Sequence, residues 1–247
     1  MAELRILSWN IAHGRGLARR VSTVGRVGIE RNLAAIAEVV REVRPDVVAL
    51  QEVDAPSSWS GDFDHLERLS AWTGLPHRLH RTSFELTMGR TRIACGTALL
   101  SAHPWVRARS ASFGSTWRCV KGWVAGTIDA DGVRVEVFSV HLDFLNPRVR
   151  RRQVAAFADE LSRTSVVAGD LNCVSADRGA LADLVRRAPI RLAGPSEPTF
   201  PATAPRWRLD RVLVTPAIDV RDVRVLDVRH ADHRPVVADL TVRSPEA

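Results

Sequence analysis

The motif GDLN at residues 169–172 decides the fold of this chain, together with ADHRPV at residues 231–236. GDLN follows the apolar segment 166–168 and ADHRPV leads into the apolar segment 236–242, so each motif stands at the end of a predicted strand. Together they place two Asp, one Asn and one His at strand ends. These are residue types that a metal-assisted attack on a phosphate requires.

Three more polar motifs end apolar runs elsewhere in the chain: SWN at Asn10, LQEV with Glu52, and VHLD with His141. Polar motifs at five separate strand ends are not expected by chance. The sequence therefore predicts one polar site that several strands build together.

Helical spacing is found between these strands. We predict helices at residues 29–43, 64–73, 147–161 and 181–187. Pro45 and Gly74 are stop signals after the first two helices, because proline cannot continue a helix and glycine readily adopts the left-handed conformation at its end. Asn146 followed by Pro147 is a start signal for the third, with asparagine as the N-cap and proline at the first position.

Strands are predicted at residues 4–7, 47–50, 96–100, 122–128, 133–140, 166–168, 208–215, 220–228 and 236–242. The pair Asp131-Gly132 favours a tight hairpin, which makes the strands on either side of it antiparallel. Residues 75–92 are expected to be extended and irregular. This order of elements indicates an α+β fold in which helices cover the outer faces of two packed, mainly antiparallel sheets.

Length and composition are consistent with one domain over residues 1–247, because 45% hydrophobic content supplies a substantial core and no linker or repeat interrupts the chain. No apolar run approaches the ~20 residues of a membrane span, and the N-terminus enters a strand without a leader. We therefore expect a monomeric cytoplasmic protein. Three cysteines without CxxC spacing indicate neither a disulfide framework nor a zinc site.

The positive charge of the chain leaves two interpretations open. A formal net charge of +7 would attract an anionic partner such as nucleic acid. However, nearly all of this charge is arginine, a pattern that codon usage in a GC-rich genome also produces. The same choice applies to a cluster at the start of the third helix, which is either a phosphate-binding patch or the solvated face of that helix: Arg148, Arg150, Arg151 and Arg152.

With these motifs the chain resembles, over about residues 5–242, the endonuclease/exonuclease/phosphatase superfamily, which contains DNases, abasic-site endonucleases, inositol-polyphosphate phosphatases and neutral sphingomyelinases. The resemblance implies a four-layer α/β/β/α sandwich in which the strand ends of both sheets meet at one edge. That edge would gather the polar residues in one cleft: Asn10, Glu52, His141, Asp170, Asn172, Asp210, Asp232 and His233.

A hard cation is expected in this cleft, because hydrolysis of a phosphate ester requires the negative charge of the phosphoryl oxygens to be neutralised. The available ligands are oxygen atoms, which hard cations prefer. These ligands point to Mg²⁺, with Mn²⁺ as the alternative. Glu52 is the first candidate ligand, with the amide oxygen of Asn10 beside it. The resemblance makes Glu52 the principal ligand and places Asp232 next to the metal or its waters.

Asp170 resembles the general base that orients the attacking water, and Asn172 a donor to the phosphoryl group or the nucleophile. Residues two apart on an extended segment face the same side, so both can reach the cleft. In isolation GDLN would favour ordinary turn residues instead. His141 and His233 are expected to donate to phosphoryl oxygens, and the resemblance implies that Asp210 orients His233.

The chain departs from many members of the superfamily in two ways. It has no tyrosine to contact the phosphate, so that contact is absent or made by Arg118, Lys121 or Trp123. Abasic-site endonucleases also tend to continue QE with Thr-Lys, whereas this chain reads QEVD. QEVD resembles more closely the sphingomyelinase-like and general phosphodiesterase branches. Among the remaining histidines, His13 in NIAHGRG is the one to check for a role.

These residues together predict a Mg²⁺-dependent phosphoesterase that acts by direct attack of a water activated by Asp170. Phosphodiesters are expected in preference to monoesters, and the substrate is either nucleic acid or a lipid or small-molecule phosphodiester. The alternative function is a non-catalytic phosphate-binding relative. The complete set of polar motifs argues against that alternative, because a pseudoenzyme usually loses a metal ligand or base first.

Overall fold

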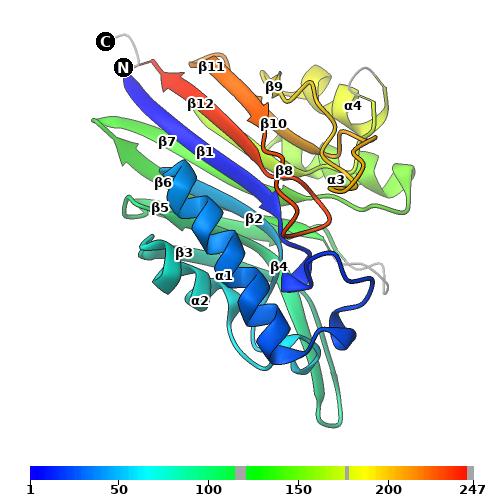
Figure 1. Ribbon diagram of the computed structural model, residues 1–247. Helices are drawn as coiled ribbons and strands as arrows, with labels where there is room; N and C mark the ends of the chain where they lie inside the picture. Colours follow the sequence, from blue (N-terminus) through cyan, green and yellow to red (C-terminus); the bar gives the residue numbers. More distant parts are fainter. Residues whose placement is uncertain (115–120, 176–177, 244–247) are drawn as a thin grey trace.

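Two six-stranded sheets form the centre of this computed structural model, which describes residues 1–114, 121–175 and 178–243 (Figure 1). From edge to edge, the first sheet consists of β11 (Ile218–Val225), β12 (Val236–Val242), β1 (Ala2–Asn10), β2 (Val47–Asp54), β4 (Thr91–Ser101) and β3 (His77–Met88). The second consists of β5 (Arg107–Ser112), β6 (Gly122–Ala130), β7 (Val133–His141), β8 (Ser165–Asp170), β10 (Asp210–Val214) and β9 (Arg191–Gly194). Both sheets are mixed but mainly antiparallel, as predicted.

Each sheet contains one parallel strand pair, β1 with β2 and β7 with β8. A parallel pair needs a crossover connection. Here the helices α1 (Gly25–Val43) and α3 (Pro147–Ala158) supply it. Two shorter helices, α2 (His65–Thr73) and α4 (Gly179–Arg187), pack beside them. The helices cover the outer faces of the sheets, which confirms the α/β/β/α layers (Figure 1).

The alternation of side chains along β1 shows how the layers are held together. Leu4 and Ile6 pack between the two sheets, whereas Leu7 and Trp9 pack on the helix side. Successive residues of a strand point to opposite faces, so a strand buried on both faces carries apolar residues on both. This pattern places Asn10, the next residue, at the strand end towards the second sheet.

Several predicted end signals are found in the structure. The Asp64 side chain accepts a hydrogen bond from the Glu67 backbone N–H at the start of α2, and Gly74 is left-handed at its end. Asn146 caps α3 by accepting from the Arg148 N–H, with Pro147 at the first position. In the hairpin between β6 and β7, Asp131 and Gly132 both have positive φ, as a two-residue turn of this kind requires.

The prediction of an irregular segment at residues 75–92 was wrong. Those residues form β3 and the start of β4, joined at Gly89 and Arg90. The strands β5 and β9 were also missed. All three missed strands, β3, β5 and β9, lie at sheet edges, where a half-exposed strand needs little apolar alternation and is held by backbone hydrogen bonds.

Several predicted boundaries were also shifted. The helix predicted at 29–43 starts at Gly25, the one predicted at 181–187 starts at Gly179, and α3 ends at Ala158 instead of residue 161. Within the described part of the chain, no helix is long and apolar enough to cross a bilayer.

Candidate active site

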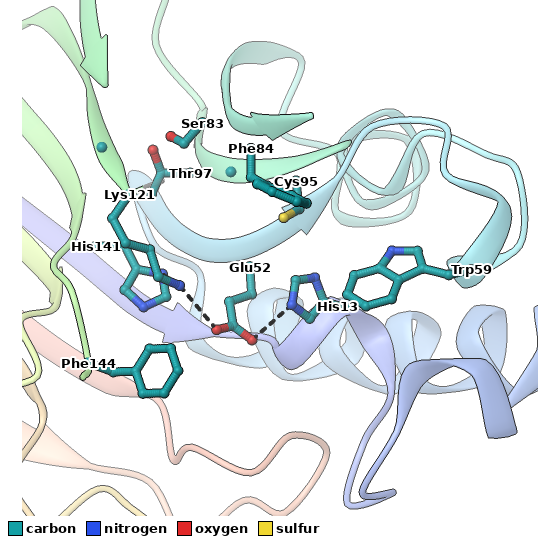
Figure 2. Close-up of a pocket in the computed structure, with 12 residues that line it drawn as sticks. His13, Glu52, Trp59, Ser83, Phe84, Cys95, Thr97, Lys121, His141 and Phe144 are labelled. Carbon is teal, nitrogen blue, oxygen red and sulfur yellow. Dashed lines mark hydrogen bonds and ion pairs between the residues drawn. The ribbon is translucent and has the colours of Figure 1, made fainter. Parts of the chain in front are cut away.

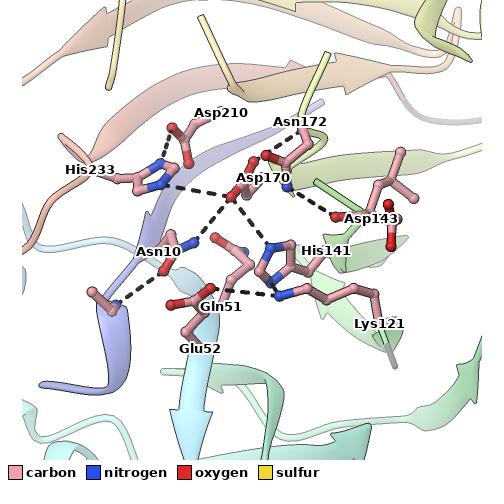
Figure 3. Close-up of polar contacts among 12 residues, drawn as sticks. Asn10, Gln51, Glu52, Lys121, His141, Asp143, Asp170, Asn172, Asp210 and His233 are labelled. Atoms are coloured by element: carbon pink, nitrogen blue, oxygen red, sulfur yellow. Dashed lines mark hydrogen bonds and ion pairs between the residues drawn. The ribbon is translucent and has the colours of Figure 1, made fainter. Parts of the chain in front are cut away.

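The parallel strand pairs of both sheets end at one cleft (Figure 3). Asn10 is the last residue of β1 and is in register with Gln51 on β2. In the second sheet, His141 at the end of β7 is in register with Asp170 at the end of β8. Because parallel strands end on the same side of a sheet, each sheet delivers polar residues to this cleft: Asn10 and Glu52, the residue after Gln51, from the first, and His141 and Asp170 from the second.

Asp170 lies at the centre of the polar contacts. Its Oδ2 accepts a hydrogen bond from Asn10 Nδ2 at 3.1 Å, and lies 3.4 Å from His141 Nε2 and 3.8 Å from His233 Nε2. Burial raises the pKa of Asp170 to about 6, although the charge of His233 opposes this shift. At neutral pH Asp170 is therefore ionised but close to its protonation point, which suits a general base.

The GDLN motif is both a turn and a part of the site. Gly169 has φ +152°, and a Cβ there would lie 2.0 Å from the Val140 carbonyl oxygen, so only glycine fits between the strands. Asn172 is left-handed, and its N–H donates to Asp170 Oδ1 at 3.0 Å. Its side-chain Nδ2 donates to the Leu142 carbonyl oxygen. These two bonds fix the Asp170 carboxylate relative to the loop that follows it.

His233 is held by Asp210. Its Nδ1 donates to Asp210 Oδ2 at 2.8 Å, and the Thr199 hydroxyl donates to the same oxygen at 2.5 Å. Burial alone would lower the pKa of His233, but the charges of Asp210 and Asp170 outweigh it and raise the pKa to about 10. The imidazolium therefore persists at neutral pH, with Nε2 directed towards Asp170. Thr199 was missed in the sequence, where no signal marks it.

His141 lies between Lys121 and Asp170. Lys121 Nζ is 3.2 Å from His141 Nδ1, while Nε2 on another edge of the ring is 3.4 Å from Asp170 Oδ2. Burial, followed by the charge of Lys121, holds the pKa of His141 well below its ordinary value. The neutral ring accepts a hydrogen bond from Lys121 at Nδ1. The carboxylate that was expected beside one ring nitrogen is Asp170, which faces Nε2.

Glu52 occupies a β-bulge in β2. The register with β4 shifts between Gln51 and Val53, so Glu52 is the extra residue, and its φ is +55°. Bulges re-aim a side chain, and this one turns Glu52 into the cleft. Burial opposes ionisation of Glu52, but His13 at 3.2 Å and Lys121 at 3.6 Å outweigh it and lower the pKa of this carboxyl group. Glu52 is ionised at neutral pH.

His13, the remaining histidine to check, contacts both Glu52 and Asp54. Its Nδ1 donates to the buried Asp54 carboxylate at 2.7 Å, and its Nε2 lies 3.2 Å from Glu52 Oε2. Asp54 also accepts from Trp59 Nε1 at 2.7 Å. Ala12 and His13 are both left-handed, a costly conformation that concentrates at functional sites. Asp54 was missed in the sequence: it follows Glu52 by two residues in QEVD, but that spacing does not identify it as the partner of His13.

The remaining predicted residues have varied surroundings. Asp232 lines the cleft and forms an ion pair with Arg15. The amide oxygen of Asn10 accepts a hydrogen bond from the Ala12 N–H. Arg118 lies outside the described residues. Arg150 lines the cleft and donates to the Asp143 carbonyl oxygen, so one member of the predicted arginine cluster reaches the site.

The cleft has three arms that share Glu52. One contains the polar residues described above, and its walls include Val174, Phe200 and Leu209. The second holds about 290 Å³ and is mostly apolar, with Trp59 among its lining residues (Figure 2). The third is lined by arginines, namely Arg15, Arg19 and Arg20.

The donors at Glu52 fit a hard divalent cation. Glu52 and Asn10 offer carboxylate and amide oxygens to the same arm. His13 and Lys121 approach the Glu52 carboxylate, as expected where positive charge is favoured. Asp170, Asp210 and His233 also place donor atoms within 4.8 Å of one another. There, however, Asp210 and His233 bind each other, which leaves Glu52 as the better metal position.

Sequence comparison identifies the family of this chain. The endonuclease/exonuclease/phosphatase family profile matches residues 7–233. The chain belongs to this family. No match is found among curated proteins. The family contains phosphoesterases, and the buried Asp and His residues of this member lie where the two sheets of the fold meet.

Solved structures of family proteins share the fold. An endonuclease/exonuclease/phosphatase from Beutenbergia cavernae DSM 12333 superimposes with a TM-score of 0.78 at 23% identity, covering 99% of this chain and 72% of that one. A mannosyl-6-phosphatase from Bacteroides thetaiotaomicron VPI-5482 has a TM-score of 0.71 at 14% identity, covering 96% and 99%. TDP2 from D. rerio, in complex with a single-strand DNA product, has a TM-score of 0.69 at 14% identity, covering 98% and 100%.

Proposed function

We propose that this protein is a Mg²⁺-dependent phosphodiesterase that cleaves a P–O bond by direct attack of water, without a covalent intermediate. The observation that carries this proposal is the arrangement around Asp170 Oδ2, which accepts a hydrogen bond from Asn10 and faces the Nε2 atoms of His141 and His233. The pKa of the Asp170 carboxyl group is raised to about 6 and that of the His233 imidazole to about 10, so a base and a proton donor coexist at neutral pH. Pairs of groups whose surroundings separate their pKa values in this way are typical acid and base partners.

Asp170 orients the attacking water and accepts its proton. His233, held by Asp210 through Nδ1, presents its Nε2–H to a phosphoryl oxygen, and Asn172 has a further amide hydrogen for the same purpose. Lys121 adds positive charge beside Glu52. Preorganised donors of this kind stabilise the charge that develops in the transition state.

Glu52 and Asn10 would hold the cation, with Asp232 near its waters. When bound, Mg²⁺ neutralises charge on the phosphoryl oxygens and on the leaving oxygen. Mn²⁺ has a similar preference for oxygen ligands and is expected to substitute.

The proposed substrate is a phosphodiester. The names of the structural neighbours cover both a sugar phosphatase and a protein bound to a DNA product, so they do not separate these classes. Arg150 and the arm with Arg19 and Arg20 favour an anionic substrate. In the α3 cluster, Arg148, Arg151 and Arg152 are exposed, which is consistent with a solvated helix face.

A hydrolysis panel tests the proposal. Plasmid DNA, abasic DNA, RNA, sphingomyelin and bis-p-nitrophenyl phosphate are each incubated with and without Mg²⁺. We expect turnover of at least one phosphodiester that requires the metal and is lost in Asp170→Asn. Asp183→Asn is the matched control, because this carboxylate on α4 forms ion pairs with Arg151 and Arg186 away from the site.

Equal activity in the parent protein and Asp170→Asn would indicate a contaminant. Absence of turnover across the panel, with retained binding of inorganic phosphate, would favour the non-catalytic phosphate-binding alternative.

A further inference from the structure

The second arm of the cleft, the apolar arm, extends beyond the residues that bind the scissile phosphate in the proposed function. It opens beside Glu52, and its walls come from β3, β4, β6 and the loops around them: Trp59, Ser83, Phe84, Cys95, Gly96, Thr97, Gly122 and Phe144. Figure 2 shows Phe84 and Phe144 on opposite sides of the Glu52 carboxylate. Phe144 is 56% exposed, a large apolar side chain left open to solvent at the rim.

Two β-bulges shape this arm. Glu52 is the extra residue in β2, and the shift of register between Thr82 and Phe84 makes Ser83 the extra residue in β3. Both bulges flank Gly96 on β4, which pairs with Val53 on one side and Thr82 on the other. Bulges beside active sites re-aim side chains, and these two turn Glu52 and Phe84 towards the same space.

Two glycines that line this space allow the neighbouring strands to approach closely. A Cβ on Gly96 would lie 1.7 Å from the Arg81 carbonyl oxygen, and one on Gly122 would lie 2.5 Å from the Ala111 carbonyl oxygen. The backbone approaches too closely at both positions for any other residue. The arm is therefore a formed part of the fold rather than a gap between loosely placed side chains.

The direction of attack assigns this arm a role. The polar arm and the apolar arm share Glu52, His141 and Phe144, which marks their junction as the place for the scissile phosphate. Asp170 lines only the polar arm and Lys121 only the apolar arm. They contact different nitrogens of the His141 ring, so the imidazole lies between them.

Displacement at phosphorus places the attacking and leaving oxygens roughly in line on opposite sides. If water attacks from the Asp170 side, the leaving oxygen departs on the Lys121 side. The new bond joins the water oxygen to phosphorus, and Asp170 takes the proton of that water. The bond to the leaving oxygen breaks with its electron pair, and that oxygen takes a proton from solvent water.

We propose that the apolar arm is the leaving-group subsite and that it takes an uncharged, ring-bearing alcohol esterified to the scissile phosphate. This inference rests on the proposed function. The volume of about 290 Å³ lies at the small end of ligand pockets and accommodates one ring system. Among the residues that the structure describes, no arginine lines the arm, and its one lysine contacts Glu52 and His141. The described walls with Trp59, Phe84 and Phe144 therefore favour an uncharged ring over a second phosphate.

Cyclohexyl methyl phosphate is the substrate that tests this assignment. Its two alcohols are of similar acidity, so the enzyme rather than the chemistry decides which bond breaks. We expect cyclohexanol and methyl phosphate as the products, with the ring alcohol favoured about tenfold or more. Methanol and cyclohexyl phosphate as products would place the ring on the other side and overturn the assignment, while the proposed phosphodiesterase activity would stand.

Variants locate the preference within the cleft. Phe84→Ala removes one wall and should reduce the product ratio about tenfold, because the contact between the ring of the substrate and Phe84 supplies the selectivity. Phe84→Leu, which retains apolar bulk, should recover part of the ratio. Val174→Ala is the matched control, because Val174 is an exposed apolar residue on the wall of the polar arm. A ratio that depends on Val174 and not on Phe84 would contradict the proposal.

Binding separates failure of this inference from failure of the proposed function. Calorimetry with cyclohexyl phosphate and methyl phosphate needs no turnover. The parent protein should bind the cyclohexyl ester about tenfold more tightly, and Phe84→Ala should lose that preference. If no phosphodiester is hydrolysed but this pattern holds, the proposed function fails and the apolar subsite remains. If both esters bind equally to the parent protein, the subsite is wrong.

Discussion

The two halves of this molecule have the same architecture but present different chemistry at the cleft. Each sheet has a central parallel pair joined by a helix, β1-α1-β2 in one and β7-α3-β8 in the other. In each, two further antiparallel strands lie on either side of that pair. The strand ends of the first half supply Asn10 and Glu52, and those of the second supply His141 and Asp170.

The two acidic residues differ because of what surrounds them. The Glu52 side chain is 22% exposed and faces His13 and Lys121, whose charges lower the pKa of this carboxyl group despite its burial. The Asp170 side chain is 3% exposed, and burial raises its pKa to about 6. One carboxylate is thus suited to hold a cation and the other to accept a proton. In the proposed mechanism, local electrostatics would therefore adapt the same scaffold to two roles.

The largest effect is expected for Glu52→Gln. Removing one anionic oxygen from a site with few protein ligands should lower turnover to the background rate while the fold persists. Circular dichroism and kinetics at increasing Mg²⁺ would check this. Near-normal activity at saturating Mg²⁺ would remove Glu52 from the metal position, and an unfolded variant would make its role structural.

Asp170→Asn should reduce kcat by ~10²- to 10⁴-fold, because the change removes the basic oxygen and keeps the shape of the side chain. The melting temperature should stay the same or rise above pH 6. A carboxyl group whose folded pKa is raised costs stability once it ionises, and asparagine removes that cost. A loss of kcat smaller than tenfold would contradict the assignment of Asp170 as base.

The same pKa predicts the acidic limb of the pH–rate profile. Asp170 works as a base only when it is ionised, so kcat/KM should decrease as the pH is lowered through about 6. Glu52 should not contribute to this limb, because its pKa is lowered. An acidic limb at the ordinary pKa of an aspartate would contradict the prediction, and it would show that the surroundings of Asp170 are more polar than its contacts indicate.

His233 and Asp210 should behave as one unit. His233→Ala and Asp210→Ala should each reduce kcat by roughly 10²-fold or more, the scale of acid–base contributions. The double variant should be little worse than His233→Ala alone, because Asp210 acts through the His233 ring that it orients. A double-mutant cycle on kcat measures this coupling. Fully additive losses would contradict a shared role.

The strand-end motifs predicted the layered fold and the position of the site, because apolar runs and polar ends survive in the sequence pattern. Edge strands such as β3 were missed, since backbone pairing holds them and their side chains show little apolar alternation. The bulge at Glu52 could not be predicted either, because it depends on the register with β4. For the same reason, the sequence marked His13 but could not identify Asp54 as its partner.

The smallest expected effect concerns His13, which joins the bulged carboxylate of the first half to the buried Asp54. Groups that orient a metal ligand typically change metal affinity by 10- to 100-fold when they are replaced. His13→Gln should therefore raise the Mg²⁺ concentration for half-maximal activity about tenfold and leave kcat at saturating Mg²⁺ nearly unchanged. Calorimetry with Mg²⁺ alone should show the same loss without turnover. Trp59→Phe, which removes only one donor to Asp54, should have a smaller effect in the same direction. If His13→Gln instead lowered kcat at saturating metal with unchanged Mg²⁺ binding, His13 would contact the substrate. The strand ends of the first sheet would then bind substrate as well as the metal.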